Sequence, residues 1–181
     1  MDFKIVLEKL VSAFDKMDVR YALMGGLALG VWGVPRATVD IDFLIRRDDL
    51  EKVDRIMHDL GYECRHRSEN VSQYISPLNL FGEVDFLHAF RSASIEMLQR
   101  AAEKEVHGGS LRIKVLRPED IVGLKLQAIK NNPSRAYSDT ADIRQLLAVS
   151  PENVDWNLIK TYCGLLGLDE MYDEIRGGLG K

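Results

Sequence analysis

The chain has 181 residues, a formal net charge of -4 at pH 7, 46% apolar residues and 29% charged residues. This composition excludes a disordered chain, and the negative charge argues against a protein that coats long nucleic acid through many Lys and Arg contacts. The length suits one compact core with an extension, and no apolar run approaches the ~20 residues that a membrane helix needs. Because the first residues lack the layout of a signal peptide, the cytoplasm is the expected compartment.

The N-terminal elements follow from simple apolar patterns. Helical spacing predicts an opening helix over residues 3–18, with Ile5 among its apolar positions. The apolar run 21–24 predicts a short buried strand that stops at Gly25 and Gly26. A short helix is expected after these glycines, until the Gly-Val-Pro sequence that follows breaks it.

Two further strands are predicted to carry an acidic face. Residues 39–45 alternate in polarity, so that Asp40 and Asp42 share one face and apolar side chains occupy the other. Residues 83–88 repeat this pattern with Asp85 on the acidic face. The two strands are therefore the first place to look for chemistry.

The remaining signals define the fold class. Asp48 is the predicted N-cap of a helix that ends near Gly61. Further strands are expected at 62–66, 71–76 and 111–116, and further helices at 95–105, 118–131, 138–148, 154–165 and 168–176. The sequence thus predicts an α+β fold, with a mixed sheet flanked by helices in domain 1–117 and a helical C-terminal extension, 118–181, packed on it.

A glycine pair and a polar loop precede the first acidic strand. Gly25 and Gly26 stand between a predicted strand and a predicted helix, where the absence of a Cβ lets backbone amides approach a phosphate. Arg36 and Thr38 lie in the loop that leads to the acidic strand. Either glycines or paired acids alone would be commonplace, but their combination in this order predicts a nucleotide-phosphate site.

The paired aspartates point to divalent cations. Asp40 and Asp42 project from the same strand face, and two ionised carboxylates so close together repel, so the pair implies either metal binding or a raised pKa on one member. Magnesium is favoured because oxygen ligands beside phosphate suit it. A two-metal phosphoryl transfer needs a third carboxylate, for which Asp85 is the candidate and Glu83 the alternative. The other interpretation of Asp85 is a solvated acid on the outer face of a strand. We expect two Mg²⁺ ions held by Asp40, Asp42 and Asp85.

The stretch GGLALGVWGVPRATVDIDFLI resembles the first motif of the polymerase-beta-type nucleotidyltransferase superfamily. Within that superfamily the chain is most similar to the AbiEii-like branch, known from bacterial abortive-infection and toxin–antitoxin systems. The matching residues are Gly25, Gly26, Ala28, Leu29, Arg36, Asp40 and Asp42.

This resemblance implies a nucleotidyltransferase fold and a function. The implied reaction is the Mg²⁺-dependent transfer of a nucleoside monophosphate from a nucleoside triphosphate to a hydroxyl group of an RNA, a protein or a small molecule, with release of pyrophosphate. Among these acceptors tRNA or a protein is expected, with a cognate antitoxin as a further partner. No membrane partner is expected, because the chain has no long apolar run.

The resemblance also extends into the helical part. The phrase PEDIVGLKLQAI puts Lys125 at the position of a triphosphate-binding lysine, and SRAYSDTADI offers Arg135, Asp139 and Asp142, with Asp139 expected at the nucleotide. Ser138 stands where the branch has a lysine, so one cationic contact is missing or comes from elsewhere. From the residues alone, Lys125 suits a solvated surface lysine equally well, and the two aspartates suit a solvated helix face.

Other functions are weighed against this one. A non-catalytic nucleotide-binding or interaction module on the same fold is the alternative, consistent with Ser138. A Rossmann-like dinucleotide binder is a weaker hypothesis because GGLALG lacks the GxGxxG order. The basic run 65–67 is interpreted as a solvated strand end rather than a nucleic-acid contact.

Overall fold

The computed structural model describes residues 1–78, 81–149 and 151–178. The chain forms two compact units: unit 1 consists of Met1–Val31 and Arg36–Leu116, and unit 2 of Trp32–Pro35 and Arg117–Lys181. Residues 150 and 179–181 of the predicted helical extension lie outside the described residues.

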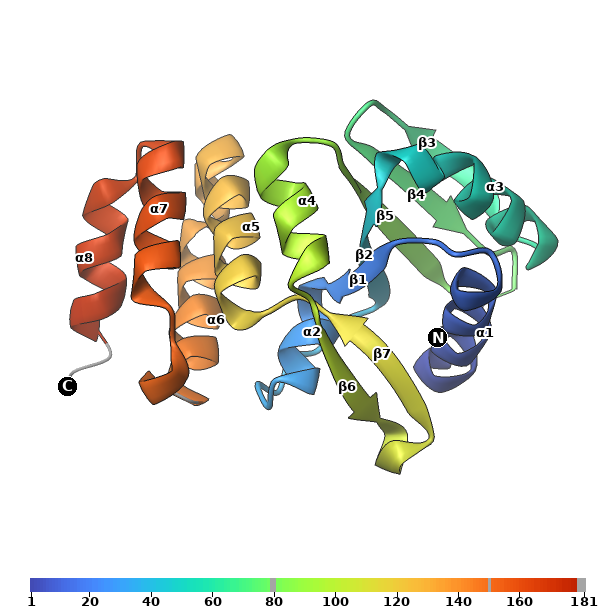
Figure 1. Ribbon diagram of the computed structural model, residues 1–181, viewed down its shortest axis with the longest axis horizontal. Coiled ribbons are helices and arrows are strands. Elements are labelled where there is room, and N and C mark those ends of the chain that lie inside the picture. The colour runs from blue at the N-terminus through green and yellow to red at the C-terminus, as the bar shows by residue number, and fades with distance from the viewer. Residues whose placement is uncertain (79–80, 150, 179–181) are drawn as a thin grey trace. The chain divides into compact units, whose positions relative to one another are not determined.

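Unit 1 is built on a mixed sheet (Figure 1). Over the described residues it has seven strands in the order β3-β4-β5-β2-β1-β7-β6. The parallel pairs are β2 with β5 and β1 with β7, and the other neighbours are antiparallel. The strands are β1 (Tyr21–Met24), β2 (Asp40–Arg46), β3 (Glu63–Arg67), β4 (Val71–Ile75), β5 (Glu83–Ala89), β6 (Ala102–Val106) and β7 (Leu111–Val115).

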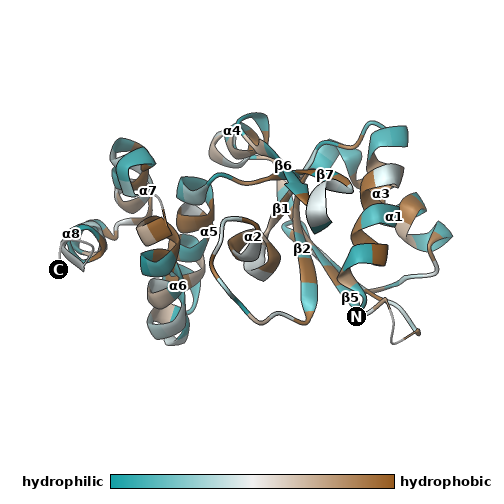
Figure 2. Ribbon diagram, turned by 90° about the horizontal axis from the view of Figure 1, so that it is seen from below, coloured by the Kyte–Doolittle hydropathy of each residue, from teal (hydrophilic) through white to brown (hydrophobic). Residues whose placement is uncertain are grey.

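Helices cover both faces of this sheet, with α1 and α3 on one side and α2 and α4 on the other (Figures 1 and 2). On the α1 side, Phe14 meets Phe43 edge-on with ring centroids 5.3 Å apart, and Phe43 stacks on Phe86 at 5.9 Å. All three rings are buried, and burial of each such side chain stabilises the fold by about 1.5–3 kcal/mol. The helices are α1 (Phe3–Lys16), α2 (Gly25–Val31), α3 (Leu50–Asp59) and α4 (Ser92–Gln99).

The opening helix begins where the side chain of Asp2 accepts a hydrogen bond from the backbone N–H of Ile5, at 3.1 Å. This bond satisfies one of the N–H groups that a helix N-terminus leaves unpaired. Its apolar stripe passes through Val6, Leu10 and Phe14, which are buried. Ile5, expected in that stripe, is 37% exposed because it lies beside the buried face rather than on it.

The entry to α3 differs from the predicted N-cap. Asp48 does not cap the helix; it accepts a hydrogen bond from Arg46, and a short 3-10 turn precedes α3. The neighbouring Asp49 is buried and accepts hydrogen bonds from the backbone N–H of Arg20 at 3.0 Å and from its Nε at 2.8 Å. A long-range ion pair, rather than a local cap, therefore fixes this helix start.

The predicted helix over residues 95–105 was wrong in its second half. Helix α4 ends at Gln99, and Ala102–Val106 form strand β6, which pairs with β7 in a hairpin. This segment, AEKEV, has strong helix formers, but pairing along the edge of the sheet overrides a propensity of a few tenths of a kcal/mol per residue. The turn at Gly108 and Gly109 and the closing strand agree with the prediction.

Unit 2 is helical, as expected for the C-terminal part. Its helices α5 and α7 meet at close range, since a Cβ on Gly123 of α5 would lie 2.7 Å from the ring of Tyr162 on α7. Among the described residues, no helix combines the length and the apolar character needed to cross a membrane. The helices are α5 (Pro118–Asn131), α6 (Ala136–Val149), α7 (Trp156–Leu166) and α8 (Asp169–Gly178).

Candidate active site

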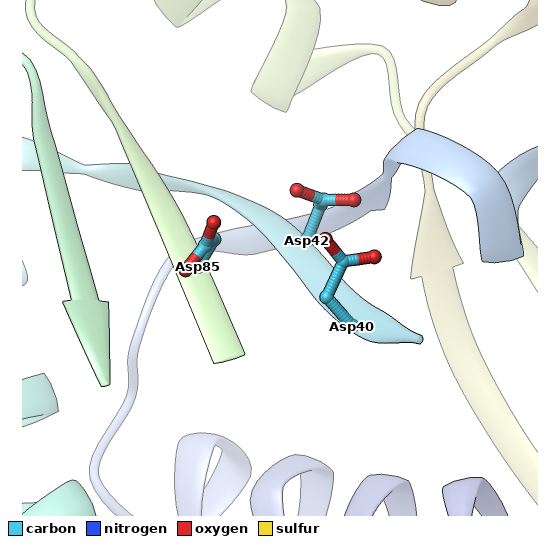
Figure 3. A group of neighbouring side chains, drawn as sticks. All are labelled: Asp40, Asp42 and Asp85. Atoms are coloured by element: carbon cyan, nitrogen blue, oxygen red, sulfur yellow. The ribbon is translucent and has the colours of Figure 1, made fainter. Parts of the chain in front are cut away.

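Three carboxylates converge on one face of the sheet in unit 1 (Figure 3). The parallel pairing of β2 with β5 puts Asp42 directly opposite Asp85 and Asp40 opposite Glu83. One oxygen from each of Asp40, Asp42 and Asp85 lies within 4.8 Å of the others. The expectation that the two acidic strands are neighbours, with the three aspartates on one face, is confirmed.

Hydrogen bonds orient two of these carboxylates. Thr38 Oγ1 donates to Asp40 Oδ1 at 2.6 Å, and Gln73 Nε2 donates to Asp85 Oδ2 at 3.0 Å. The other oxygen of Asp85, Oδ1, is buried and has no hydrogen-bond partner among the described residues. Burial raises the pKa of Asp85, and the charges of Asp40 and Glu83 add to this, against the opposing hydrogen bond from Gln73.

These observations fit a hard divalent cation. A buried carboxylate oxygen without a donor costs free energy unless something positive satisfies it, and here two further carboxylates lie within reach of the same point. The donor set consists only of oxygens, which Mg²⁺ prefers. Asp40, Asp42 and Asp85 are the residues that could hold the ion.

The glycine turn lies against the acidic strand. Gly25 has a φ of +68°, and a Cβ built on it would lie 1.9 Å from Asp42 Oδ2. A Cβ on Gly26 would lie 2.8 Å from the Cβ of Thr38. The sequence suggested these glycines only as a phosphate-binding turn, whereas the structure also requires Gly25 for the close approach to β2 and Gly26 for the close approach to the loop before it.

Arg36 is exposed in the loop before β2. Its assignment to the nucleotide, like that of Gly25, Gly26 and Thr38, stays a prediction. Thr38 has an additional role, because its hydroxyl orients Asp40.

Lys125 and Asp139 belong to unit 2, where they form a buried charge cluster. Lys125 Nζ donates to Asp139 Oδ1 at 2.8 Å and to Asp142 Oδ2 at 2.7 Å, and Arg135 Nε donates to Asp139 Oδ2 at 2.8 Å. The side chain of Lys125 is 13% exposed and that of Asp139 only 2%. The interpretation of these residues as a solvated surface is therefore wrong, while their role toward a nucleotide stays a prediction.

The electrostatics of this cluster favour the charged form of Asp139. Burial tends to raise the pKa of Asp139, but the hydrogen bonds from Arg135 and Lys125 outweigh it and leave the pKa below its usual value. Ser138, which stands where a lysine was expected, is exposed, and its hydroxyl donates to the backbone oxygen of Arg135 at 3.2 Å.

The arginines of the basic run on β3 form ion pairs with neighbouring carboxylates. Arg65 lies 3.5 Å from a carboxylate oxygen of Glu83, and Arg67 donates to Asp54 at 2.7 Å. Every residue of β3 is exposed. This agrees with the interpretation as a solvated strand end.

Gln73 is a site residue that the sequence did not reveal. It alternates with the buried Ser72 and Tyr74 on β4, so its side chain had to point to the opposite face. The missing information was the pairing of β4 with β5, which puts Gln73 opposite Asp85.

This mixed sheet, with convergent carboxylates on two paired parallel strands beside a tight glycine turn, agrees with the nucleotidyltransferase class of folds that the sequence resemblance implied. The chain belongs to that class at the level of sequence as well. Its residues 4–176 match the family described as "Uncharacterised nucleotidyltransferase", so it is a member of this family.

Solved structures share the fold. An antigenic nucleotidyltransferase-like protein from Paracoccidioides brasiliensis has a TM-score of 0.61 and 19% identity, covering 98% of this chain and 92% of that one. The antibiotic-resistance factor ANT(2'')-Ia has a TM-score of 0.58 and 17% identity, with the same coverage of 98% and 92%. The lincosamide antibiotic adenylyltransferase LnuA has a TM-score of 0.57 and 17% identity, covering 80% of this chain and 96% of that one.

A comparison with curated proteins found no significant match. The nucleotidyltransferase superfamily expected from the sequence is confirmed by the family match, and the assignment to the AbiEii-like branch stays a hypothesis.

Proposed function

We propose that this protein is a metal-dependent nucleotidyltransferase that moves a nucleoside monophosphate from a nucleoside triphosphate to a hydroxyl group and releases pyrophosphate. The observation that carries the proposal is the convergence of Asp40, Asp42 and Asp85, with a buried Asp85 oxygen that has no partner among the described residues. Membership of the nucleotidyltransferase family supports the reaction class.

In this proposal the three aspartates hold two Mg²⁺ ions. When bound, these cations would polarise the phosphoryl oxygens and stabilise the attacking and leaving oxygens. Thr38 keeps Asp40 turned toward its neighbours through the 2.6 Å hydrogen bond. Asp85 completes the ligand set from the neighbouring strand and is the carboxylate proposed to take the proton of the attacking hydroxyl.

The triphosphate is proposed to meet backbone N–H groups at Gly25 and Gly26 and the side chain of Arg36. For Lys125, in unit 2, the triphosphate role that the sequence resemblance implies is kept as part of the proposal. An ammonium group has three N–H donors, and Lys125 gives two of them to Asp139 and Asp142. The third donor is proposed for a phosphate oxygen. Asp139 would act at the nucleotide through Lys125, whose ammonium it helps to orient.

For the acceptor we favour a small molecule. ANT(2'')-Ia has been solved with adenylyl-2''-tobramycin, in a structure of which this chain covers 95%, and LnuA has been solved with lincomycin. These neighbours support a small-molecule hydroxyl on a chain of this size, while tRNA or a protein acceptor and a cognate antitoxin rest on the sequence resemblance alone. The cytoplasmic location likewise rests on the sequence.

The test is transfer of label from α-³²P nucleoside triphosphates with Mg²⁺, in separate reactions with small-molecule extract, total tRNA and total protein. The wild-type chain should label one pool, and Asp42→Asn should label none. The matched control is Asp59→Asn, because Asp59 is an aspartate whose side chain is 71% exposed on α3. Its labelling should equal that of the wild type.

The alternative, a binding module without catalysis, gives a different result. Such a protein would gain thermal stability from Mg²⁺ and a triphosphate, in a manner sensitive to Asp42→Asn, while no pool became labelled. A wild type that shows neither labelling nor ligand-dependent stabilisation would refute both functions.

A further inference from the structure

Gln73 on β4 contacts the candidate metal site from outside the acidic strands. We propose that Gln73 is a positioning residue, which holds Asp85 in the orientation that a divalent cation requires while leaving the negative charge of the site intact. The proposal deepens the proposed function and rests on it.

The sheet register fixes this arrangement. Pairing of β2 with β5 puts Asp42 opposite Asp85, and pairing of β5 with β4 puts Gln73 opposite Asp85. Directly opposed residues share one face, and in an antiparallel pair such as β4 with β5 their Cβ atoms are about 4.5–5.5 Å apart. Asp42, Asp85 and Gln73 therefore form a row across three strands, with Asp85 in the middle.

The hydrogen bond from Gln73 gives the two carboxylate oxygens of Asp85 different roles. Gln73 Nε2 donates to Oδ2 at 3.0 Å, while Oδ1 stays buried without a partner among the described residues. Gln73 is itself half-buried, so water competes only partly for this bond. A carboxylate anchored at one oxygen has its rotamer set, and the other oxygen is then a preorganised ligand.

The neutrality of the amide is the second part of the argument. A Lys or Arg opposite Asp85 would also donate a hydrogen bond, but it would cancel one of the charges that attract the cation. Unit 2 offers the contrast, because there Asp139 is buried against the cations Lys125 and Arg135. The carboxylate of Asp139 is thus neutralised by cations, whereas that of Asp85 is oriented by a neutral amide and keeps its charge available for a metal ion.

The experiment measures Mn²⁺ binding directly, by the loss of the free Mn²⁺ signal in electron paramagnetic resonance titrations, without any turnover. Gln73→Met keeps the length of the side chain and removes the donor. Gln73→Lys keeps a donor but adds a positive charge, and it remains informative if Gln73→Met folds poorly. The matched control is Gln145→Met, because Gln145 is an exposed glutamine on α6.

Gln73→Met should raise the Kd for Mn²⁺ by about 10-fold or more, the usual effect of removing a partner of a metal ligand. Gln73→Lys should raise it at least as much, and Gln145→Met should leave it unchanged. Thermal denaturation without metal separates this from a structural role, since a residue needed only for the strand would lower the melting temperature and not the Mn²⁺ affinity.

Two failures are distinguishable with the help of Asp42→Asn. If the wild type binds Mn²⁺, Asp42→Asn does not, and a folded Gln73→Met (or Gln73→Lys, where Gln73→Met does not fold) binds like the wild type, the positioning role is overturned and the proposed function survives. If the wild type binds no more Mn²⁺ than Asp42→Asn, the metal site itself is refuted and the role of Gln73 falls with it.

Discussion

The buried cluster around Lys125 makes a strong prediction about stability. In Lys125→Met, the ammonium that donates to Asp139 at 2.8 Å and to Asp142 at 2.7 Å is replaced by an apolar group of similar length. Both carboxylates lose a charged partner in a place where their side chains are only 2% and 6% exposed. The folded state should therefore be destabilised.

The magnitude follows from the burial and the remaining partner. Removing one member of a buried ion pair costs about 3–5 kcal/mol, because a buried charge is left uncompensated. Arg135 still donates to Asp139 at 2.8 Å, so part of the charge pairing is retained and we expect a loss of about 2–4 kcal/mol. For a chain of this length, that corresponds to a decrease in melting temperature of roughly 5–15 °C.

Urea denaturation followed by circular dichroism at pH 7 measures this loss. Adding Asp142→Asn to Lys125→Met should cost less than the sum of the two single changes, since each single change already breaks the 2.7 Å ion pair between these two residues. A loss below about 1 kcal/mol, the value of an exposed pair, would refute the reasoning, as would strict additivity.

Three further predictions concern unit 1. Gly25→Ala should destabilise the fold by about 1–3 kcal/mol and abolish Mn²⁺ binding, because its Cβ would overlap the carboxylate of Asp42; unchanged binding would contradict the close approach. Burial tends to raise the pKa of Asp49, but hydrogen bonding from Arg20 lowers it to about 2. This pair should therefore add about 1–2 kcal/mol to the free energy of unfolding, a contribution that is present above pH 4 and disappears toward pH 2. Acid titrations of Asp49→Asn should lack that loss. Burial lowers the pKa of His88, so the unfolded chain binds the proton first and stability should fall as the pH drops below about 6.5. The urea midpoint of His88→Gln should not show this decrease.

Most of the fold could be predicted because its signals are local. The alternation in β2 and β5, the glycine stops and the helical spacing after Pro118 each lie within a few residues of one another. The errors arose where a distant partner decides the structure. Segment 102–106 becomes a strand because β7 lies beside it, and Asp49 starts α3 through Arg20, 29 residues earlier.

The candidate site was predictable only in part for the same reason. The shared phase of Asp40, Asp42 and Asp85 followed from strand alternation, because a parallel pairing in register preserves faces. The contact of Gln73 with Asp85 could not be predicted, because it depends on which strand lies beside β4. The burial of Asp139 could not be derived either, since the spacing of charges on one helix says nothing about the lysine that pairs with it from another.

The stack of Phe43 on Phe86 has a consequence for the opposite face of the sheet. These residues are direct partners in the β2–β5 register, one position along from Asp42 and Asp85, and their rings lie 5.9 Å apart and nearly parallel. A slip of one residue would set Phe43 against Asp85 and drive a carboxylate into the aromatic core, at a cost of several kcal/mol. Packing on the hydrophobic side of the sheet therefore helps to fix the strand register on the acidic side. A core substitution such as Phe86→Leu would thus change the positions of the carboxylates although it makes no contact with them.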